Sequence, residues 1–289
     1  MITENLSHIN TFNIPKIIWI AVNYFNDNES IKFIKEQYLK QGTTDCLFLL
    51  VNNGATDSNV LKREINNWNK IELITPDKNL GYFGALNFAL DYIAEKFKTY
   101  PDKVIFSNTD ISLLSSDLIQ NISKLKIETN VACVGPAIFK EGISVNQNPF
   151  MMNRVSRGKL LFLKTLFSNY SAYLLYQWFA YLKENTFAAT KKEVPNMDVY
   201  ALHGSFLIFG KSFLTSCNHM LKDAPFLFGE EIFLAEICRR EEFVLNYNKA
   251  FSIMHHEHSV TGKYKSKQTV FYLHQSISLL LEKYFRREN

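Results

Sequence analysis

The stretch Val104–Asp110, VIFSNTD, combines an apolar run with consecutive polar side chains. The run predicts a buried β-strand, and Asn108, Thr109 and Asp110 then place an amide, a hydroxyl and a carboxylate at its end. Oxygen ligands clustered at a strand end can hold a hard divalent cation. The same residue types also form turns and helix caps. The stretch alone leaves both interpretations open, a cation site and a capped strand end.

The composition is that of an ordinary globular protein. Of the 289 residues, 47% are hydrophobic and 21% are charged, and the formal net charge is +4. So small a charge, without runs of Lys or Arg, gives no support for a nucleic-acid partner. The chain is long enough to bury a substantial core in one large domain or two smaller ones.

The four cysteines and the N-terminal residues bear on the cellular compartment. Cys46, Cys133, Cys217 and Cys238 form no CxxC pair, and most lie in apolar stretches. We interpret them as buried free thiols in a reducing compartment. Residues 1–15 are polar and lack the basic and apolar regions of a signal peptide. We therefore expect a cytoplasmic protein.

Strand-like and helix-like segments alternate through the first 140 residues. Strands are expected at 17–22, 46–51, 71–75, 104–107 and 131–138, the last interrupted at Gly135-Pro136, and helices at about 29–41, 61–68, 83–97 and 118–125. This alternation predicts an α/β fold around a mostly parallel sheet, in which ligands bind beyond the carboxyl ends of the strands. Polar residues cluster where strands stop or helices start, at Asn23, Asn52, Asn79–Gly84 and Asn108–Asp110. We expect a binding site at that edge.

The later part of the chain adds two polar groups. Strands are expected at 206–209, 243–247 and 250–254, and a last helix at about 268–286. Glu230 and Glu231 follow Gly229 at a helix start, where they face in different directions and need separate partners. Residues 255–258, HHEH, form either a solvated cluster or part of a metal site that needs a carboxylate from elsewhere, for which Asp110 is the candidate.

The segment 157–185 is rich in aromatic residues and is expected to form one long helix, between an irregular stretch at 141–156 and a polar loop at 186–198. Polar residues interrupt it, which argues against a transmembrane helix. Two interpretations remain open. The helix packs on the body of the protein or on a second subunit as a homodimer contact, or it lies at a membrane surface.

Several motifs, in the same order, resemble those of the family-two glycosyltransferases, which have the GT-A fold. The resemblance is greatest to the rhamnosyltransferase-like branch that builds bacterial surface polysaccharides, and it covers roughly residues 16–140 and 199–262. The motifs are Val22–Asn26, Val51–Asp57, Asn79–Asn87, Ser107–Asp110, Phe228–Glu231, and His255 with Glu257–Ser259.

The resemblance implies a single GT-A domain with a mostly parallel, Rossmann-like nucleotide-binding sheet flanked by helices. It divides the chain into a nucleotide-sugar-binding half at 16–140, an aromatic-rich helical insertion at 141–198, an acceptor and catalytic half at 199–262, and a C-terminal helix at 263–289.

The resemblance also implies the roles of individual residues. Glu231 is expected to act as the catalytic base, and Glu230 to bind acceptor hydroxyls or cap its helix. Asp110 and His255 are expected to hold Mn²⁺ or Mg²⁺. The residues expected to bind the nucleotide sugar are Val22, Asn23, Tyr24, Asn26, Asn52, Asn53, Asn79, Gly81, Gly84, Asn87, Asn108, Thr109 and Asp110. Those expected to contact the acceptor are His203, Gly204, Ser205 and Glu230.

Three positions depart from the family's pattern. Asn52 stands where the family usually has an Asp that accepts a hydrogen bond from a pyrimidine ring, and an amide loses the charge-assisted bond. Glu231 stands in place of the usual Asp. Asn108 leaves its motif with a single carboxylate, so that metal binding needs a histidine and the donor diphosphate.

The expected activity is an inverting, metal-dependent hexosyl transfer. The sugar, with rhamnose as one candidate, would pass from a nucleotide-diphosphate donor to a saccharide or lipid-linked acceptor in cell-surface polysaccharide synthesis. UDP- and dTDP-sugars are favoured over GDP-sugars. A divalent ion neutralises the leaving diphosphate, and a histidine ligand favours Mn²⁺. Attachment to the inner face of the cell membrane would follow if 157–185 lies at a membrane.

Other classes of protein remain alternatives. A non-catalytic nucleotide-sugar-binding or assembly protein is suggested by 157–185. A sugar-1-phosphate nucleotidyltransferase would need a Gly-rich basic loop after the first strand, which 23–28 lacks. A dinucleotide oxidoreductase is disfavoured because no GxGxxG follows that strand. Lys263 and Lys265 either close over the diphosphate or are ordinary surface residues.

Overall fold

The computed structural model describes residues 14–42, 45–54, 58–140, 143–184, 194–256 and 266–286, with the backbone alone at 143–145 and 178–184. Some of the residues singled out above lie outside these ranges. They are 55–57 of the second motif, 257–259 of the histidine cluster, Lys263 and Lys265, and most of the loop expected at 186–198.

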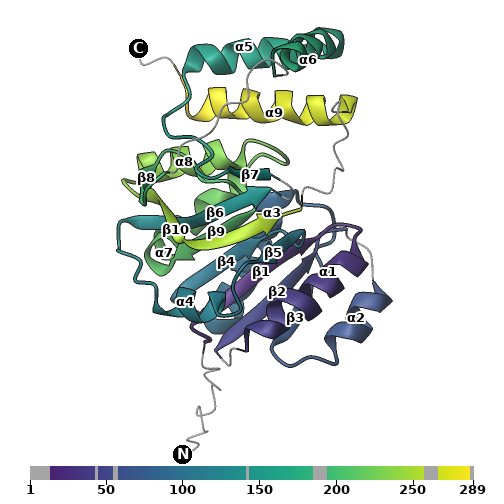
Figure 1. Cartoon of the computed structure of the whole chain (residues 1–289), viewed down its shortest axis with the longest axis vertical. Coiled ribbons are helices and arrows are strands. Elements are labelled where there is room, and N and C mark those ends of the chain that lie inside the picture. The colour runs from purple at the N-terminus through teal and green to yellow at the C-terminus, as the bar shows by residue number, and fades with distance from the viewer. Residues whose placement is uncertain are drawn as a thin grey trace, which may run out of the picture.

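A mixed sheet forms the centre of the protein (Figure 1). In spatial order its strands are β3 (Ile71–Ile74), β2 (Cys46–Asn52), β1 (Ile17–Asn23), β4 (Lys103–Ser107), β9 (Phe206–Gly210), β6 (Val131–Lys140), β10 (Val244–His255) and β5 (Ile111–Leu113). Strands β3, β2, β1 and β4 run parallel, and so do β6 and β10, while β9 is antiparallel to both of its neighbours. Two short strands, β7 (Ile143–Asn146) and β8 (Met197–Val199), extend the sheet beside β6 and β10. The predicted α/β fold with a mostly parallel sheet is confirmed.

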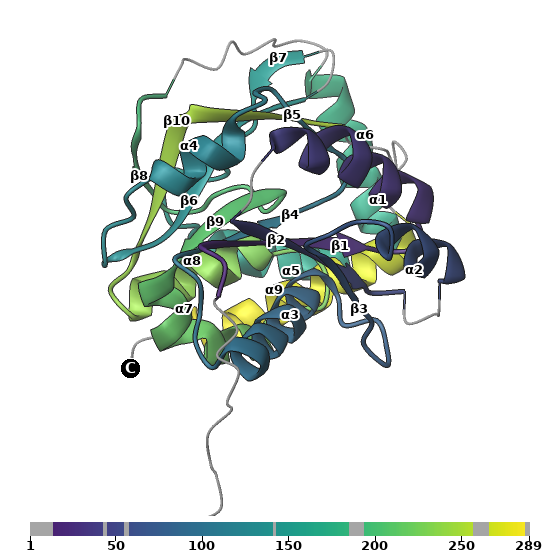
Figure 2. The ribbon, with the colours of Figure 1, turned by 90° about the horizontal axis from the view of Figure 1, so that it is seen from below.

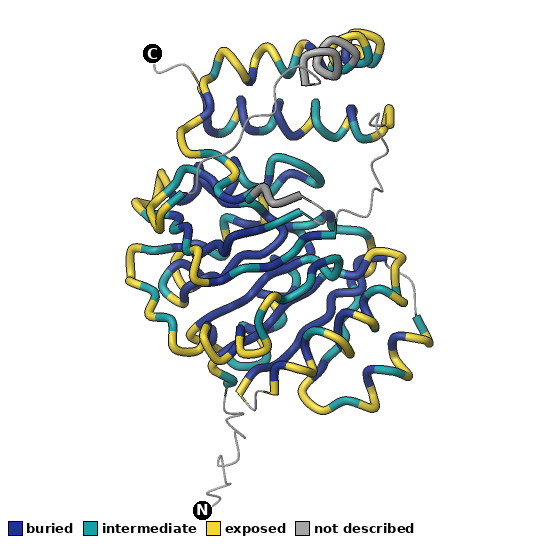
Figure 3. Tube along the Cα trace, in the orientation of Figure 1, coloured by how far each residue is buried: buried dark blue, intermediate teal, exposed yellow. Residues whose placement is uncertain are grey.

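Helices cover both faces of the sheet (Figure 2). One face carries α1 (Asp27–Phe33), α2 (Asn59–Ile65) and α4 (Leu118–Lys124), and the other carries α3 (Tyr82–Phe97), α7 (Lys211–Cys217) and α8 (Glu230–Arg240). Alternate residues of β1 supply the two cores, because Trp19 packs with the first group and Ile18 and Ile20 with the second. Burial on both faces explains why these strands are almost continuously apolar. The strands form the buried centre in Figure 3.

A further layer, α5 (Arg157–Ser168), α6 (Tyr170–Glu184) and α9 (Lys267–Lys283), lies beyond α8 (Figure 1). A buried carboxylate ties it to the body. Glu236 on α8 accepts hydrogen bonds from Arg154 at 2.8 and 2.9 Å and from the Tyr200 hydroxyl at 2.7 Å, and Arg154 also donates to the Tyr284 carbonyl. Burial alone would raise the pKa of Glu236, but these hydrogen bonds outweigh it and the pKa is lowered. The ionised carboxylate therefore ties α8, through Arg154, to the segment before α5 and to the residue that follows α9.

The strands predicted from apolar runs are confirmed, and three boundaries are corrected. The single helix expected at 157–185 is broken at Asn169, whose side-chain oxygen caps α6 by accepting the N–H groups of Ser171 and Ala172. The strands expected at 243–247 and 250–254 are one strand, β10, with an irregular register between Asn248 and Ser252. Strand β6 continues through Gly135-Pro136. Its pairing with β9 already ends at Val134, so the missing N–H of Pro136 breaks no hydrogen bond to β9.

Smaller differences concern helix ends and strands that were not expected. The first helix starts at Asp27 and continues as a π-helix at Ile34–Tyr38 and a 3₁₀ turn at Leu39–Gln41, and the second ends at Ile65, before Trp68. Strand β8 begins inside the loop expected at 186–198, and α7 and the 3₁₀ helix Asn218–Asp223 were not anticipated. All four cysteines are buried and free, as predicted. No helix in the described ranges is both long and apolar enough to cross a membrane.

Candidate active site

The ends of β1 and β2 are joined by buried asparagines. Asn23 and Asn52 stand opposite each other in the strand register, and the Asn23 amide donates to the Asn52 side-chain oxygen at 3.1 Å. The same amide donates to Asp27, and the Asn23 oxygen accepts from the Ser30 hydroxyl, both at 2.8 Å. The oxygen of Asn52, expected to face a nucleobase, thus accepts a hydrogen bond from within the protein.

A second group of polar residues shapes the loop that leads into α3. The Asn53 amide donates to Asn79 at 3.0 Å, and its oxygen accepts from the Leu80 N–H at 2.9 Å. Gly81 has φ of 76°, and a Cβ there would lie 1.9 Å from the Phe226 carbonyl oxygen. Only glycine fits this contact, which presses the loop against the segment that precedes α8.

Other residues expected to bind the nucleotide sugar lie apart from these networks. Asn87 lies further along α3 and donates to Asp91 at 3.1 Å, and Asn26 is exposed and donates to Glu29. Val22 is half-buried, and a Cβ on Gly84 would lie 3.0 Å from the Leu80 side chain. Their contribution to binding stays a prediction.

An exposed aromatic pair follows β1. Tyr24 and Phe25 are 54% and 65% exposed, and their ring centroids are 4.7 Å apart. Phe25 has φ of 53°, which is strained for a bulky residue, and its ring lies against Gly54. The sequence analysis named Tyr24 as a site residue but not Phe25. The only indication for Phe25 in the sequence was its position next to Tyr24.

Asp110, which follows β4, and His255, the last residue of β10, lie next to each other. The Nε2 atom of His255 lies 3.3 Å from Asp110 Oδ1 and 3.4 Å from the Asn108 amide nitrogen. The His256 N–H donates to the Asp110 carbonyl at 2.8 Å, which fixes the backbones beside each other. Thr109 lines a small cavity of about 270 Å³ with Asp110 and His256.

This pair fits two adjacent ligands of a divalent ion. Asp110 Oδ1 is buried, makes no hydrogen bond to any described residue, and lies 3.3 Å from His255 Nε2. Ligands about 2.1 Å from an octahedral ion and at right angles to each other are about 3 Å apart, close to the observed separation. No group of three or more His, Cys, Asp or Glu side chains suited to a metal occurs in the described part of the chain.

The residues expected at the acceptor lie next to this pair. The His203 and His255 ring centroids are 5.7 Å apart, and His203 Nδ1 lies 3.0 Å from the Ser205 hydroxyl. The Ser205 carbonyl accepts the Asn108 N–H at 3.1 Å. Phe150, which the sequence did not single out, places its ring 6.2 Å from that of His203.

Glu230 and Glu231 begin α8 directly after Gly229, which has φ of 81°. Glu230 is buried and Glu231 half-buried. Burial raises the pKa of both carboxyls, and the charge of Glu231 raises that of Glu230 further. The Glu231 carboxylate accepts the Gly204 N–H, which partly offsets the effect of burial. Raised carboxyl pKa values of this kind are common at catalytic sites, which makes the two residues candidates for the site.

Tyr82 connects the metal-site pair with the acidic pair. Its hydroxyl donates to the Gly204 carbonyl at 3.1 Å, and its ring packs on Phe106 with centroids 4.5 Å apart. Burial raises the pKa of Tyr82, and the charges of Asp110, Glu230 and Glu231 raise it further, so all three carboxylates are near enough to act on this phenol. No sequence pattern distinguished Tyr82, because an aromatic residue at a helix start is ordinary core.

Comparisons with known proteins identify the fold. No protein-family model matches the sequence, and no curated protein matches it either. A mannosyltransferase from Pyrobaculum calidifontis, solved in complex with GDP-Man and Mn²⁺, is 12% identical with a TM-score of 0.50, over 87% of this chain and 59% of that one. GalNAc-T7, solved with UDP, GalNAc and Mn²⁺, is 10% identical with a TM-score of 0.51, over 93% of this chain and 48% of that one. The protein therefore has the fold of the GT-A glycosyltransferases, and it spans about half the length of these two structures.

The buried acidic pair should make the protein less stable as the pH rises. Because burial raises the pKa of Glu230 from 4.5 to about 8, the folded chain binds more protons than the unfolded chain between these values, and stability falls as the pH rises across that window. We predict that Glu230→Gln increases the free energy of unfolding at pH 7 by about 1–2 kcal/mol. Urea denaturation across a pH series measures it. The exposed Glu95→Gln serves as the control, and a Glu230→Gln protein as pH-sensitive as the parent would contradict the prediction.

Proposed function

We propose that this protein is a metal-dependent glycosyltransferase that moves a sugar from a nucleotide-diphosphate donor to an acceptor hydroxyl. The carrying observation is the proximity of a carboxylate–imidazole pair, Asp110 and His255, to the buried Glu230 and half-buried Glu231, since all three carboxylates raise the pKa of Tyr82. The GT-A fold places this convergence at the carboxyl ends of its strands, where ligands of α/β sheets bind. The four divisions of the chain named above would then be the parts of one catalytic domain.

The donor is assigned to the edge formed by β1, β2 and β4. Both similar structures carry a nucleotide or nucleotide sugar together with Mn²⁺, one with GDP-Man and one with UDP. Bound between the diphosphate and the protein, Mn²⁺ or Mg²⁺ would neutralise the charge of the leaving group. Asp110 and His255 would hold the ion, and Asn108 lies close enough to reach either the ion or the sugar.

Glu231 is assigned as the base that takes the proton of the acceptor hydroxyl. Its raised pKa makes it a better proton acceptor near neutral pH than an exposed carboxylate. The hydrogen bond from Gly204 holds its orientation, and the Tyr82 hydroxyl holds Gly204 in turn. A base on the face opposite the leaving diphosphate gives a single displacement with inversion. Glu230, one residue away, would bind acceptor hydroxyls together with His203, Gly204 and Ser205.

The finer assignments rest on the sequence motifs. These are a hexosyl donor with rhamnose as a candidate, a preference for UDP or dTDP, and a role in surface polysaccharide synthesis. The two similar structures hold a guanine and a uracil nucleotide, so they favour neither base. Because the oxygen of Asn52 already accepts from Asn23, base selection would depend on the backbone of the 52–54 turn and the exposed Tyr24 and Phe25 rings.

A non-catalytic nucleotide-sugar-binding or assembly protein is the second candidate function. The acidic pair argues against this candidate function. Burial of Glu230 and partial burial of Glu231 reduce stability, and a non-catalytic scaffold would gain nothing in return. A nucleotidyltransferase would need basic groups after β1, and residues 23–28 supply none. Hydrolysis or transfer of a donor sugar in the presence of Mn²⁺ separates an enzyme from a scaffold.

The base assignment predicts a specific loss. Glu231→Gln should reduce sugar transfer by about 10²–10⁴-fold, because the amide cannot accept the proton. Thermal stabilisation by the nucleotide should survive, since the amide keeps the shape of the side chain. The exposed Glu241→Gln at the other end of α8 is the matched control and should transfer at the parental rate. A Glu231→Gln protein as active as the parent would remove Glu231 from this role.

The metal assignment predicts a change in binding that can be measured without catalysis. UDP-, dTDP- and GDP-sugars are tested for thermal stabilisation with and without Mn²⁺, because a bound ligand stabilises the folded state by mass action. We expect Mn²⁺ to strengthen the effect of the preferred donor. In Asp110→Asn and in His255→Ala, Mn²⁺ binding should weaken at least about tenfold. Retention of the full Mn²⁺ effect in both variants would place the ion elsewhere.

We also propose that the outer helices contact an anionic membrane surface. Leu161, Phe162, Leu175 and Tyr176 on α5 and α6 are 39–57% exposed, and we call them the outer apolar face. Between Gly142 and Lys183 the sequence has no Asp or Glu, and Lys159 is exposed on the same helix as Leu161 and Phe162. Exposed apolar and cationic side chains together suit anionic lipids. The competing occupant of the face is a second copy of the chain.

Vesicle sedimentation distinguishes a membrane surface from a second copy of the chain as the occupant of the outer apolar face. We predict binding to vesicles of phosphatidylcholine and phosphatidylglycerol, weaker binding to phosphatidylcholine alone, and loss of both in the Phe162→Ser/Leu175→Ser double variant. Val60→Ser, which changes an equally exposed apolar residue on α2, is the control. If the parent does not bind vesicles, and ultracentrifugation shows a dimer for the parent and a monomer for the double variant, the face is a homodimer contact.

A further inference from the structure

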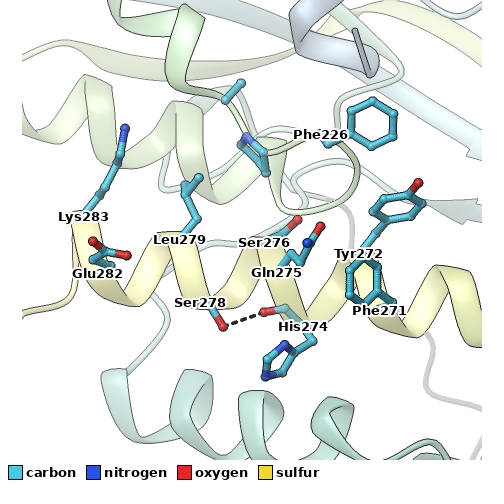
Figure 4. Close-up of a pocket in the computed structure, with 12 residues that line it drawn as sticks. Phe226, Phe271, Tyr272, His274, Gln275, Ser276, Ser278, Leu279, Glu282 and Lys283 are labelled. Carbon is cyan, nitrogen blue, oxygen red and sulfur yellow. Dashed lines mark hydrogen bonds between the residues drawn. The ribbon is translucent and has the colours of Figure 1, made fainter. Parts of the chain in front are cut away.

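A pocket of about 610 Å³ lies between the turn at 224–226 and one side of α9 (Figure 4). Its volume is within the range of about 300–1,000 Å³ typical of small-molecule sites. Figure 4 shows the rings of Phe226 and Tyr272 near each other at one end and Glu282 and Lys283 at the other. No residue of this pocket belongs to the motifs that define the donor edge.

The pocket is continuous with the segment that carries the acidic pair. The Ser276 hydroxyl on α9 donates to the Leu227 carbonyl at 2.7 Å. Leu280, one turn further, would lie 3.4 Å from a Cβ placed on Gly229. Glu230 and Glu231 follow immediately. Helix α9 is thus fixed by direct contacts to the residues on either side of Phe228, and the turn that lines the pocket continues along the chain to the proposed base.

The contact between Phe226 and Gly81 separates this pocket from the donor edge. The Phe226 backbone is pressed against Gly81, and the networks of Asn23, Asn53 and Asn79 lie beyond it. In a single displacement the acceptor approaches from the side opposite the leaving diphosphate. The pocket therefore lies on the α9 side of Phe226, away from the donor edge.

The pocket offers the chemistry that binds a sugar ring. The Phe226 and Tyr272 ring centroids are 5.1 Å apart, and the Phe271 centroid lies 5.7 Å from that of Tyr272. Aromatic faces carry partial negative charge and attract the polarised C–H groups of a pyranose. The amide of Gln275 and the carboxylate of Glu282 are exposed and can bind hydroxyls. Aromatic faces beside polar groups suit a saccharide better than an acyl chain.

We propose that this pocket binds a pyranose unit of a saccharide acceptor, through stacking on Tyr272 and Phe271 and hydrogen bonds to Gln275 and Glu282. The identification of that saccharide as the acceptor rests on the proposed glycosyltransferase function. The binding of a glycoside in the pocket does not, and this allows the two ideas to be tested separately.

The first experiment measures binding alone. Octyl glycosides of glucose, galactose, N-acetylglucosamine and rhamnose are the probes, and saturation-transfer NMR on the full chain is the readout. We expect transfer to the ring protons of at least one glycoside, and its loss in Tyr272→Ala and Phe271→Ala. Leu114→Ala, which truncates a side chain of comparable exposure far from the pocket, should keep the signal. Absence of transfer to every probe, or equal transfer in all variants, overturns the proposal.

The second experiment uses the glycoside that binds as an acceptor. In Tyr272→Ala the KM for this acceptor should rise about tenfold through loss of the stacking contact, with a smaller change in the KM for the donor. An equal rise in both constants overturns the assignment to the acceptor. If the parent binds the glycoside in a Tyr272-dependent way but neither transfers nor hydrolyses any donor, the pocket stands and the proposed function fails.

Discussion

The antiparallel pairing of β5 with the end of β10 is the constraint on which the candidate site depends. It sets His255 opposite Ile111 and places the His256 N–H on the Asp110 carbonyl. Two residues far apart in the sequence thereby acquire a fixed separation of 3.3 Å between their side chains. A shift of one residue in this register would turn His255 to the other face of the sheet. The pair therefore depends on backbone hydrogen bonds made by a strand only three residues long.

Helix α8 carries two kinds of carboxylate, and the contrast explains how the site persists. In its first turn Glu230 is buried and Glu231 half-buried, no described cationic group compensates them, and their pKa values are raised. One to two turns later Glu236 is fully buried, yet Arg154 and Tyr200 satisfy it and its pKa is lowered. The second arrangement fixes the helix to its surroundings, while the first leaves reactive groups at its end. Stability contributed at Glu236 offsets part of what the acidic pair costs.

The sequence was most informative where one local rule decides the structure. Apolar runs predicted β1, β2 and β4, and strand-end asparagines predicted the polar edge, because a buried parallel strand and its turn have few alternatives. Prediction from the sequence failed where residues distant in the chain determine the local structure. Asn169 caps a helix inside a continuous aromatic segment, and β10 continues through a stretch of irregular register only because β6 lies beside it. Tyr82 has no local signal, since its importance comes from Gly204 and three surrounding carboxylates.

The same reasoning explains why the polar edge of the sheet could be predicted from the sequence and the pocket on α9 could not. A nucleotide is held by turns, and turns demand Asn and Gly at fixed spacings, as the contact of Gly81 with Phe226 shows. The pocket on α9 is made by Phe271, Tyr272, Gln275 and Leu279, whose spacing is that of any amphipathic helix. Such a surface can change its side chains without disturbing Leu280 or Ser276, which hold the helix in place. If the pocket binds the acceptor as proposed, its side chains would set the choice of acceptor, while the contacts of Leu227 and Gly229 with α9 hold the segment before Glu231 in place.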